Sequence, residues 1–238
     1  MKLYPISRFA RLVMLLAAGF LAAGSPATAA NEAHDSVTAA GDVLTEGVVE
    51  FAISYEDVGP MASMLPKSEK VFFRPGAVRV ESGTNVSLRG AVPGKTVQMI
   101  TAGELKLAFL MPAHAPAARN ELVRFESTET RRTIAETEAR QVDGVDREDD
   151  TNRLAYWVTD RIESVWSAAP ALPGFALEYS EPVNDGLSHR VARRVEARSL
   201  DASLFEIPED FEQIEVDSPR AIGRVLGERL GGKVQVME

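Results

Sequence analysis

The residues that could bind a metal are few and widely spaced in this chain. The three histidines are His34, His114 and His189, and there is no cysteine. None of the histidines has the His-x-His, His-x-x-x-His or Glu-x-x-His spacing that is typical of zinc and copper sites. We therefore expect solvated histidines and predict no metal centre.

The acidic and nucleophilic residues do not form a recognisable catalytic motif either. The acidic run from Asp146 to Asp150 contains Arg147 and lacks the glycine and distal glutamate of a calcium loop, so a charged hairpin tip is the better interpretation. No Gly-x-Ser-x-Gly elbow, phosphate-binding loop or dinucleotide fingerprint is present. The carboxylates Glu206, Glu209 and Asp210 are interpreted as the solvated end of the last strand. The sequence thus predicts no catalytic residue, no cofactor and no enzymatic activity.

Two apolar segments interrupt the predicted strands and carry the candidate site. The first detour runs from Val58 to Ser68 and the second detour from Ile162 to Pro173, where Ile162, Val165 and Trp166 fit one helical turn that Asp160 could cap. Exposed loops are rarely this apolar, so both detours are expected to fold back onto the sheet. The candidate residues for contact with an apolar ligand are Met61, Met64, Leu65, Ile162, Val165, Trp166, Leu172 and Phe175.

Two interpretations of the detours stay open at the level of sequence. In one, they complete the core of a sheet that has no other cover. In the other, flexible methionine side chains and a tryptophan-bearing turn form an adjustable lid over a hydrophobic cavity.

The elements that position these segments are antiparallel strands. From Glu46 onward, short alternating runs such as GVVEFAISY, VRVES, NVSLRG and ELKLAFL are separated by turn residues about every ten positions. Turns are predicted at 74–76, 82–84, 92–94 and 101–103, each of which contains glycine or proline. Alternation gives each strand one wet face and one dry face.

Other segments connect or end the strand series. Met111 to Asn120 is predicted to be a loop or a short helix. The segments TIAETEARQVDG and RLAYWVTD are predicted to form a hairpin, with the acidic run between them as its charged tip. Ser218 and Pro219 are typical of a helix start, an apolar stripe follows, and Gly231-Gly232 ends it. KVQVM could add a terminal edge strand.

The N-terminus has the pattern of a secretory signal peptide. Basic residues precede the uncharged run Leu12 to Gly24, and Ala27-Thr28-Ala29 matches a cleavage site. The run is shorter than the about 20 residues that span a bilayer, so cleavage is favoured over a retained anchor. We predict a signal peptide at 1–29, a linker at 30–45, a β domain at 46–217 and a C-terminal helix and strand at 218–238.

The charge of the chain bears on location and partners. The formal net charge is -9, and loss of the basic leader makes it more negative. Such a surface repels nucleic acid and anionic bilayer faces, so no nucleic-acid binding is predicted. No stable transmembrane insertion is expected after cleavage of the leader. The arginine pairs at 131–132 and 193–194 are expected to be solvated. A periplasmic location is the expectation.

Several phrases resemble a bacterial envelope family labelled domain of unknown function 4412. They are the segment ISYEDVGPMASMLPKSEKVFFRPGAVRVES, YWVTD at 156–160, LPG at 172–174 and FEIP at 205–208. The resemblance covers roughly 47–211. It implies an architecture similar to the lipoprotein-carrier (LolA-type) fold, which is a strongly curved antiparallel sheet, open on one side, with helices or loops in its concave face.

The sequence therefore predicts a mainly β fold, a curved antiparallel half-barrel with short helical covers and a C-terminal helix. The first functional hypothesis is an exported, non-enzymatic envelope protein that binds a lipid or other apolar ligand in the concave face. The alternative is a structural or interaction module that docks to an envelope partner through its C-terminal tail or an edge strand. A hydrolase would require a clustered acid-base pair inside the concavity.

Overall fold

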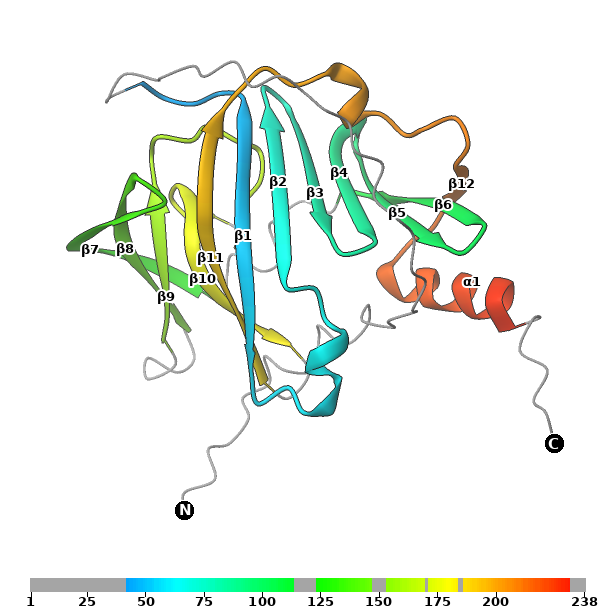
Figure 1. Ribbon diagram of the computed structural model, residues 1–238, viewed down its shortest axis with the longest axis horizontal. Coiled ribbons are helices and arrows are strands. Elements are labelled where there is room, and N and C mark those ends of the chain that lie inside the picture. The colour runs from blue at the N-terminus through cyan, green and yellow to red at the C-terminus, as the bar shows by residue number, and fades with distance from the viewer. Residues whose placement is uncertain (1–41, 114–122, 147–152, 170, 184–185, 232–238) are drawn as a thin grey trace.

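One sheet makes up most of the described protein. The computed structural model describes residues 42–113, 123–146, 153–169, 171–183 and 186–231. Its twelve strands form a single sheet in the order β12-β6-β5-β4-β3-β2-β1-β11-β10-β9-β8-β7 (Figure 1). The strands are β1 Gly47–Glu56, β2 Ser68–Arg74, β3 Ala77–Ser82, β4 Asn85–Val92, β5 Lys95–Ala102, β6 Leu105–Pro112, β7 Val123–Ile134, β8 Thr137–Asp146, β9 Arg153–Thr159, β10 Phe175–Val183, β11 Gly186–Ala197 and β12 Glu212–Glu215.

The sheet curls, and its ends do not pair with each other in the strand order. Phe73 on β2 and Phe175 on β10 have ring centroids 6.1 Å apart, although β1 and β11 lie between their strands. Three strand steps in a flat sheet would separate them by about 14 Å. Their side chains meet because the sheet bends around them, so they define its inner, concave face. The predicted curved half-barrel is confirmed, and it is the architecture that the family resemblance implied.

The turn signals in the sequence explain how the strands are joined. All four predicted turns form, and their glycines have positive φ, for example 60° at Gly83 and 68° at Gly94. Residues with a Cβ adopt this region at a cost, which is why glycine marks these positions. The β8–β9 hairpin also forms. Its predicted acidic tip lies almost wholly outside the described residues, as does most of the predicted loop at 111–120.

The turn between β7 and β8 lacks such a signal. Ala135 and Glu136 connect Ile134 to Thr137 with φ values of 47° and 63°. Two successive positive φ angles are those of a type I′ hairpin turn, for which Asn-Gly is the usual sequence. Ile134 and Ala139 are both buried in the main core. Their packing therefore holds a turn that the local sequence does not favour.

The main core lies on the inner face. Val49 and Phe51 from β1, Val71 and Phe73 from β2, and residues from β8 to β11 form one buried cluster with the second detour. On the opposite face, the 3-10 helix η4 (Ala202–Phe205) packs Phe205 against Ala77 and Leu200. Burial on both faces fixes the register, because a one-residue slip would exchange the two sets.

The C-terminal segment differs in part from the prediction. Glu206, Glu209 and Asp210 follow η4 and do not end a strand; the last strand is β12, which pairs with β6 in parallel. The 3-10 helix η2 (Pro60–Met64) and η4 are the short helices that accompany the sheet. The predicted terminal strand KVQVM lies outside the described residues.

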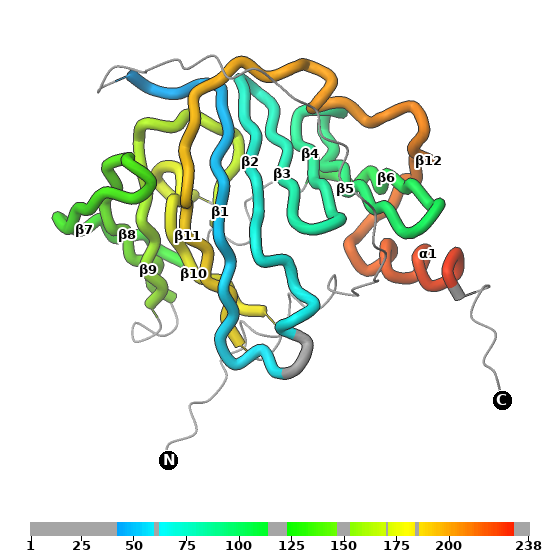
Figure 2. Tube along the Cα trace, in the orientation of Figure 1, coloured from blue at the N-terminus to red at the C-terminus, as the bar shows by residue number. Residues whose placement is uncertain are grey.

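The predicted C-terminal helix forms as α1 (Pro219–Gly231) and lies against the β5–β6 end of the sheet (Figure 2). Ile222 is fully buried against Ile100, Leu107 and Phe109. Among the described residues, no helix has both the length and the apolar character needed to cross a membrane. Helix α1 thus completes a hydrophobic cluster at this end of the sheet.

Ile222→Ala should lower the free energy of unfolding by about 2 to 5 kcal/mol, because it leaves a cavity between α1 and the sheet. The exposed Arg224 on the same helix provides the control, and Arg224→Ala should change stability by less than about 0.5 kcal/mol. Urea unfolding measures both. Equal effects would show that α1 does not pack as described.

Candidate functional site

The second detour lies on the inner face and is packed by aromatic rings. Trp166 is 9% exposed. Its ring centroid lies 4.7 Å from that of Phe175 and 6.0 Å from those of Phe51 and Tyr179. The prediction that this segment folds back onto the sheet is therefore confirmed.

The helical turn predicted within the second detour does not form, and the segment contains bends and one bridge instead. Leu44 forms a parallel bridge with Ile162: its N–H donates to the Arg161 carbonyl at 2.7 Å, and its carbonyl accepts from the Glu163 N–H at 2.9 Å. Pairing with an extended segment is incompatible with helical backbone angles at these residues. A contact distant in sequence thus overrides the local apolar spacing.

The structure brings half of the predicted site residues together. Ile162, Trp166, Leu172 and Phe175 are buried in the main core cluster. Val165 is 50% exposed, and in the first detour Met64 is 47% exposed. Leu65 is buried, but it lies outside that cluster, and the side chain of Met61 lies outside the described part of the structure.

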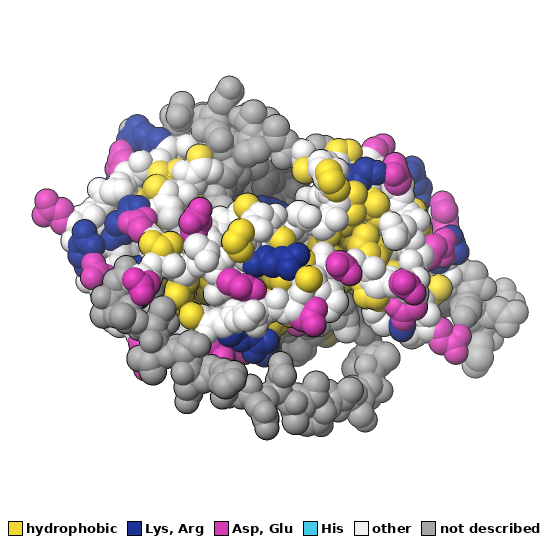
Figure 3. Space-filling model, turned by 90° about the horizontal axis from the view of Figure 1, so that it is seen from above, with side chains coloured by type: hydrophobic (Ala, Val, Ile, Leu, Met, Phe, Trp, Pro, Cys, Tyr) yellow, Lys and Arg dark blue, Asp and Glu magenta, His cyan; other side chains and the backbone are white. Residues whose placement is uncertain are grey.

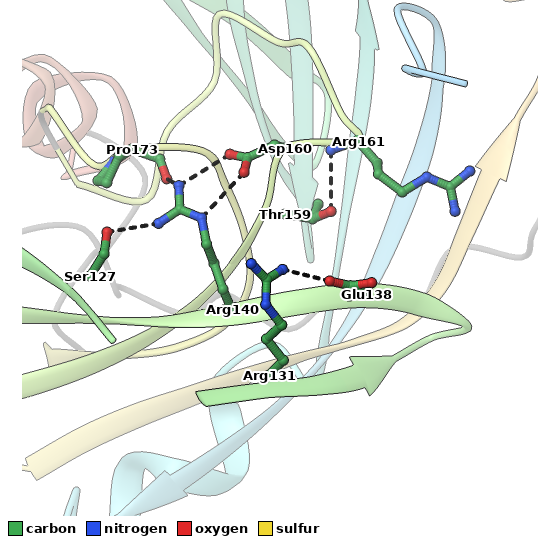
Figure 4. Close-up of polar contacts among 8 residues, drawn as sticks. All are labelled: Ser127, Arg131, Glu138, Arg140, Thr159, Asp160, Arg161 and Pro173. Carbon is green, nitrogen blue, oxygen red and sulfur yellow. Dashed lines mark hydrogen bonds and ion pairs between the residues drawn. The ribbon is translucent and has the colours of Figure 1, made fainter. Parts of the chain in front are cut away.

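Arg140 on β8 joins both ends of the second detour (Figure 4). Its guanidinium donates to the two carboxylate oxygens of Asp160 at 3.2 and 3.1 Å, and to the Pro173 carbonyl at 2.8 Å. A further N–H donates to the Ser127 hydroxyl at 3.0 Å. We call this set of four residues the Arg140 clasp. Asp160 was predicted to cap a helical turn; its carboxylate instead accepts from Arg140.

The molecule is hollowed between the two ends of the sheet when it is seen from above (Figure 3). At the start of β1 and the end of β11, residues 43–46 and 197–199 line a pocket of about 280 Å³. Leu44, one of its lining residues, is also the bridge partner of the second detour. The pocket therefore adjoins the place where the detour is attached to the N-terminal segment.

A group of polar side chains lies on the inner face beside the aromatic rings. Cross-strand register places Arg190 opposite Ile53 and Tyr179, and Ser188 opposite Tyr55 and Glu181. Glu69 lies opposite Phe51. We call Tyr55, Glu69, Tyr179, Glu181, Ser188 and Arg190 the Arg190 cluster.

Arg190 is the centre of this cluster. Its Nη1 donates to Glu181 at 2.7 Å and to the Ser188 hydroxyl at 2.8 Å. Its Nε lies 3.7 Å from a Glu69 oxygen, is buried and has no hydrogen-bond partner within the described residues. The guanidinium also lies 5.5 Å from the ring centroid of Tyr179. One edge of the guanidinium is thus engaged, and Nε, on the other edge, is unpaired.

Burial shifts the titration of the cluster. It raises the pKa of the Glu69 carboxyl, an effect that Arg190 partly offsets and Glu181 reinforces. Burial also raises the pKa of Tyr179 well above its ordinary value and that of neighbouring Tyr156 to about 12. The inner face therefore favours uncharged forms of these groups.

Sequence reasoning did not identify this cluster. The alternation of inward and outward residues along the strands does indicate it. Glu69 lies on the same face of β2 as Val71 and Phe73, and Arg190 lies on the same face of β11 as Ala192. A charged residue on the dry face of a strand is costly unless it is paired. Inward-pointing charges on two strands would have indicated a buried polar group.

A second polar row lies elsewhere on the sheet. The Ser180 hydroxyl lies 3.0 Å from His189 Nδ1, and His189 Nε2 lies 3.7 Å from Glu178. These residue types occur in hydrolase triads, but Glu178 also pairs with Arg132 on β7. A hydrolase also needs hydrogen-bond donors aimed at the developing oxyanion, from the backbone or from side chains. Within the described residues, no three His, Asp or Glu side chains are grouped as metal ligands.

No family model matches the chain, and no curated protein matches it in sequence. The label domain of unknown function 4412 thus stays a prediction.

Solved structures give distant likenesses. The structure of PNGF-II in the P21 space group has a TM-score of 0.50 at 12% identity, over 78% of this chain and 34% of that one, so this chain spans about a third of that protein. This likeness is one of fold alone. The Pseudomonas aeruginosa MucA/MucB complex (TM-score 0.38, 11% identity, 72% of this chain and 58% of that one) and LprF from Mycobacterium bovis (0.29, 14%, 70% and 90%) are more remote. Their scores are too low to support conclusions about this chain.

Arg140→Ala should release both ends of the second detour and lower the free energy of unfolding by about 1 to 3 kcal/mol, since it removes charge-assisted hydrogen bonds from a largely buried guanidinium. Hydrogen exchange in residues 160–174 should accelerate by about tenfold or more. Arg131→Ala is the control, because Arg131 on β7 is exposed and pairs only with exposed Glu138 among the contacts described. Unchanged exchange in Arg140→Ala would contradict the clasp.

Glu69→Gln should stabilise the protein at about pH 8 more than at about pH 4. Because the folded-state pKa of Glu69 is raised, folding at high pH carries the cost of a buried carboxylate, and this cost disappears below the ordinary pKa of glutamate. Urea unfolding at both pH values measures the difference, with exposed Glu104→Gln as control. If Glu69→Gln were less stable than the unaltered protein at the higher pH, the raised pKa of Glu69 in the folded state would be contradicted.

Proposed function

We propose that this protein is an exported, non-enzymatic binding protein that holds an acyl chain or a similar apolar ligand on the inner face of its sheet, beneath the second detour. The observation that carries the proposal is how the inner face is covered. Trp166 packs onto the inner-face rings from a segment whose backbone, as far as the structure describes it, is attached by one bridge and the Arg140 clasp and not by a strand ladder. Such a cover can leave the sheet without breaking it.

The energies permit a ligand to take the place of Trp166. Burying a methylene gains about 0.8 kcal/mol, so ten methylenes of an acyl chain gain about 8 kcal/mol. If only the Trp166 indole moves and Ile162 and Leu172 stay packed, removing the tryptophan from its packing costs about 3 to 5 kcal/mol. The chain's gain exceeds this cost before the displaced indole finds new contacts. The second detour then completes the core in the free protein, as the first interpretation holds, and covers the ligand as a lid in the bound protein, as the second holds.

The proposed location follows from the leader pattern at 1–29, which lies outside the described residues. Export to the periplasm places the protein between two membranes, where an acyl ligand needs shelter from water.

The sheet edges favour a second candidate function, docking to an envelope partner. Strand β7 is an edge strand of twelve residues and β12 is the other edge. An edge strand offers unpaired backbone groups for β-augmentation. Helix α1 is less suited to this role, because Ile222 is buried in the fold.

The test of ligand binding is titration with a dansyl-labelled fatty acid, together with native mass spectrometry of protein purified from its own periplasm. The protein should bind the probe and carry a co-purified lipid. Trp166→Ala should weaken probe binding by about tenfold or more by removing the ring that covers the chain, and should weaken it more than it weakens folding. Val165→Ala, at the exposed neighbour, is the control. Absence of both lipid and probe binding would contradict the proposal.

A further inference from the structure

The Arg190 cluster lies between the two detours. The Tyr55 hydroxyl donates to the Pro66 carbonyl in the first detour at 2.7 Å. The Tyr179 ring contacts Trp166 of the second detour. Arg190 is placed beside both tyrosines by the register of β1, β11 and β10. A ligand beneath Trp166 would therefore have this cluster at one end.

The guanidinium of Arg190 has hydrogen-bonding capacity to spare. Nη1 is used by Glu181 and Ser188, whereas buried Nε has no hydrogen-bond partner in the described part of the chain and forms only a long ion pair with Glu69, at 3.7 Å. An unsatisfied buried donor is costly, and 3.7 Å is too long for a hydrogen bond. An acceptor oxygen between Nε and Glu69 would remove this cost.

Charge decides which acceptor fits. Arg190 carries one positive charge, and it faces the carboxylates of Glu69 and Glu181. Ionised Glu69 would repel an anion, but burial already raises its pKa, and a second anion beside it would raise that pKa further and favour the protonated form. With Glu69 protonated, a ligand carboxylate gives the cluster the same net charge that it has when empty. The protonated carboxyl then adds a second donor for the ligand oxygen.

Access to the cluster is on the side of Glu181. The Glu181 side chain is 41% exposed, whereas those of Glu69 and Arg190 are 9% and 16% exposed. A head group can therefore approach from solvent while the chain lies against the apolar side of Tyr179.

We propose that the Arg190 cluster anchors the carboxylate of a fatty-acid ligand, with Arg190 Nε and Glu69 as donors to its oxygens and the acyl chain beneath Trp166. This assignment rests on the proposed function and names the head group of its ligand.

Binding is then coupled to a proton. The ligand carboxylate displaces the negative charge of Glu69, which takes up one proton from solvent, and the O–H bond formed on Glu69 is the only covalent change. The groups that face Glu69 are Arg190 from β11, Tyr179 and Glu181 from β10 and Tyr55 from β1. Neither tyrosine ionises near neutral pH, because burial raises both pKa values. Affinity for the carboxylate therefore increases as the pH falls toward the raised pKa of Glu69.

Calorimetric titration of the purified protein with dodecanoate, dodecanol and dodecyltrimethylammonium tests the assignment. Dodecanoate should bind about tenfold or more tightly than dodecanol, and the cation most weakly. Titration in buffers of different ionisation enthalpy at about pH 8 should show uptake of about one proton per dodecanoate. Glu69→Gln should abolish the proton uptake that accompanies dodecanoate binding, because glutamine cannot take up the proton.

Arg190→Lys should reduce the preference for dodecanoate over dodecanol, because lysine lacks the Nε–H. Arg194→Lys, on the same strand but 60% exposed, is the matched control and should leave the preference unchanged.

Equal binding of dodecanoate and dodecanol to the unaltered protein would overturn the anchor and leave the proposed function standing, whereas binding of neither would contradict both. Tightest binding of the cation, or proton uptake that persists in Glu69→Gln, would also overturn the anchor.

Discussion

The curvature of the sheet is the constraint on which the rest of the structure depends. Bending brings Phe73 and Phe175 together across two intervening strands and creates an inner face with no second sheet to cover it. A single layer of strands can bury the apolar side chains of its inner face only if another segment of the protein covers that face. The second detour supplies that cover with Trp166, and helix α1 covers the β5–β6 end with Ile222. The two covers are attached differently. Helix α1 is held by its own apolar stripe and by regular helical hydrogen bonds, whereas the detour combines the packing of Trp166 with the Arg140 clasp and, within the described residues, one bridge.

This difference links packing to the proposed function. A segment held by a few polar contacts at its ends can open locally at a smaller cost than a strand in a ladder. Beneath it, the aromatic side chains accept an apolar chain, and the Arg190 cluster introduces charge into the same concavity. The buried pair Glu69 and Arg190 does little for stability, because desolvation opposes its Coulomb attraction. Its position at one end of the concavity, with Nε unpaired, fits recognition of a head group better than a structural role.

The sequence was sufficient to predict the curved antiparallel sheet, the four glycine turns, helix α1 and the burial of the second detour, because each depends on local periodicity or on a residue with special backbone freedom. It did not predict the parallel edge strand β12. It was insufficient where distant contacts decide. Leu44 prevents the helical turn at Ile162, and the buried flanks of Ala135 and Glu136 impose a turn without glycine. The candidate ligand residues were found by apolarity alone, so Ile162, Trp166, Leu172 and Phe175 were included and the polar Arg190 cluster was missed. Inward charges become visible only once strand register is known.

The central claim is that the second detour is a removable cover, and ligand-dependent hydrogen exchange tests it most directly. In the free protein, amides of residues 160–174 should exchange faster than those of β1 and β10, which are paired on both sides. Saturating dodecanoate should change exchange in 160–174 and in the inner-face strands, and should leave α1 unchanged. Exchange in 160–174 that is as slow as in β1, and is unaffected by the ligand, would show that the segment is a fixed part of the core and would contradict the account.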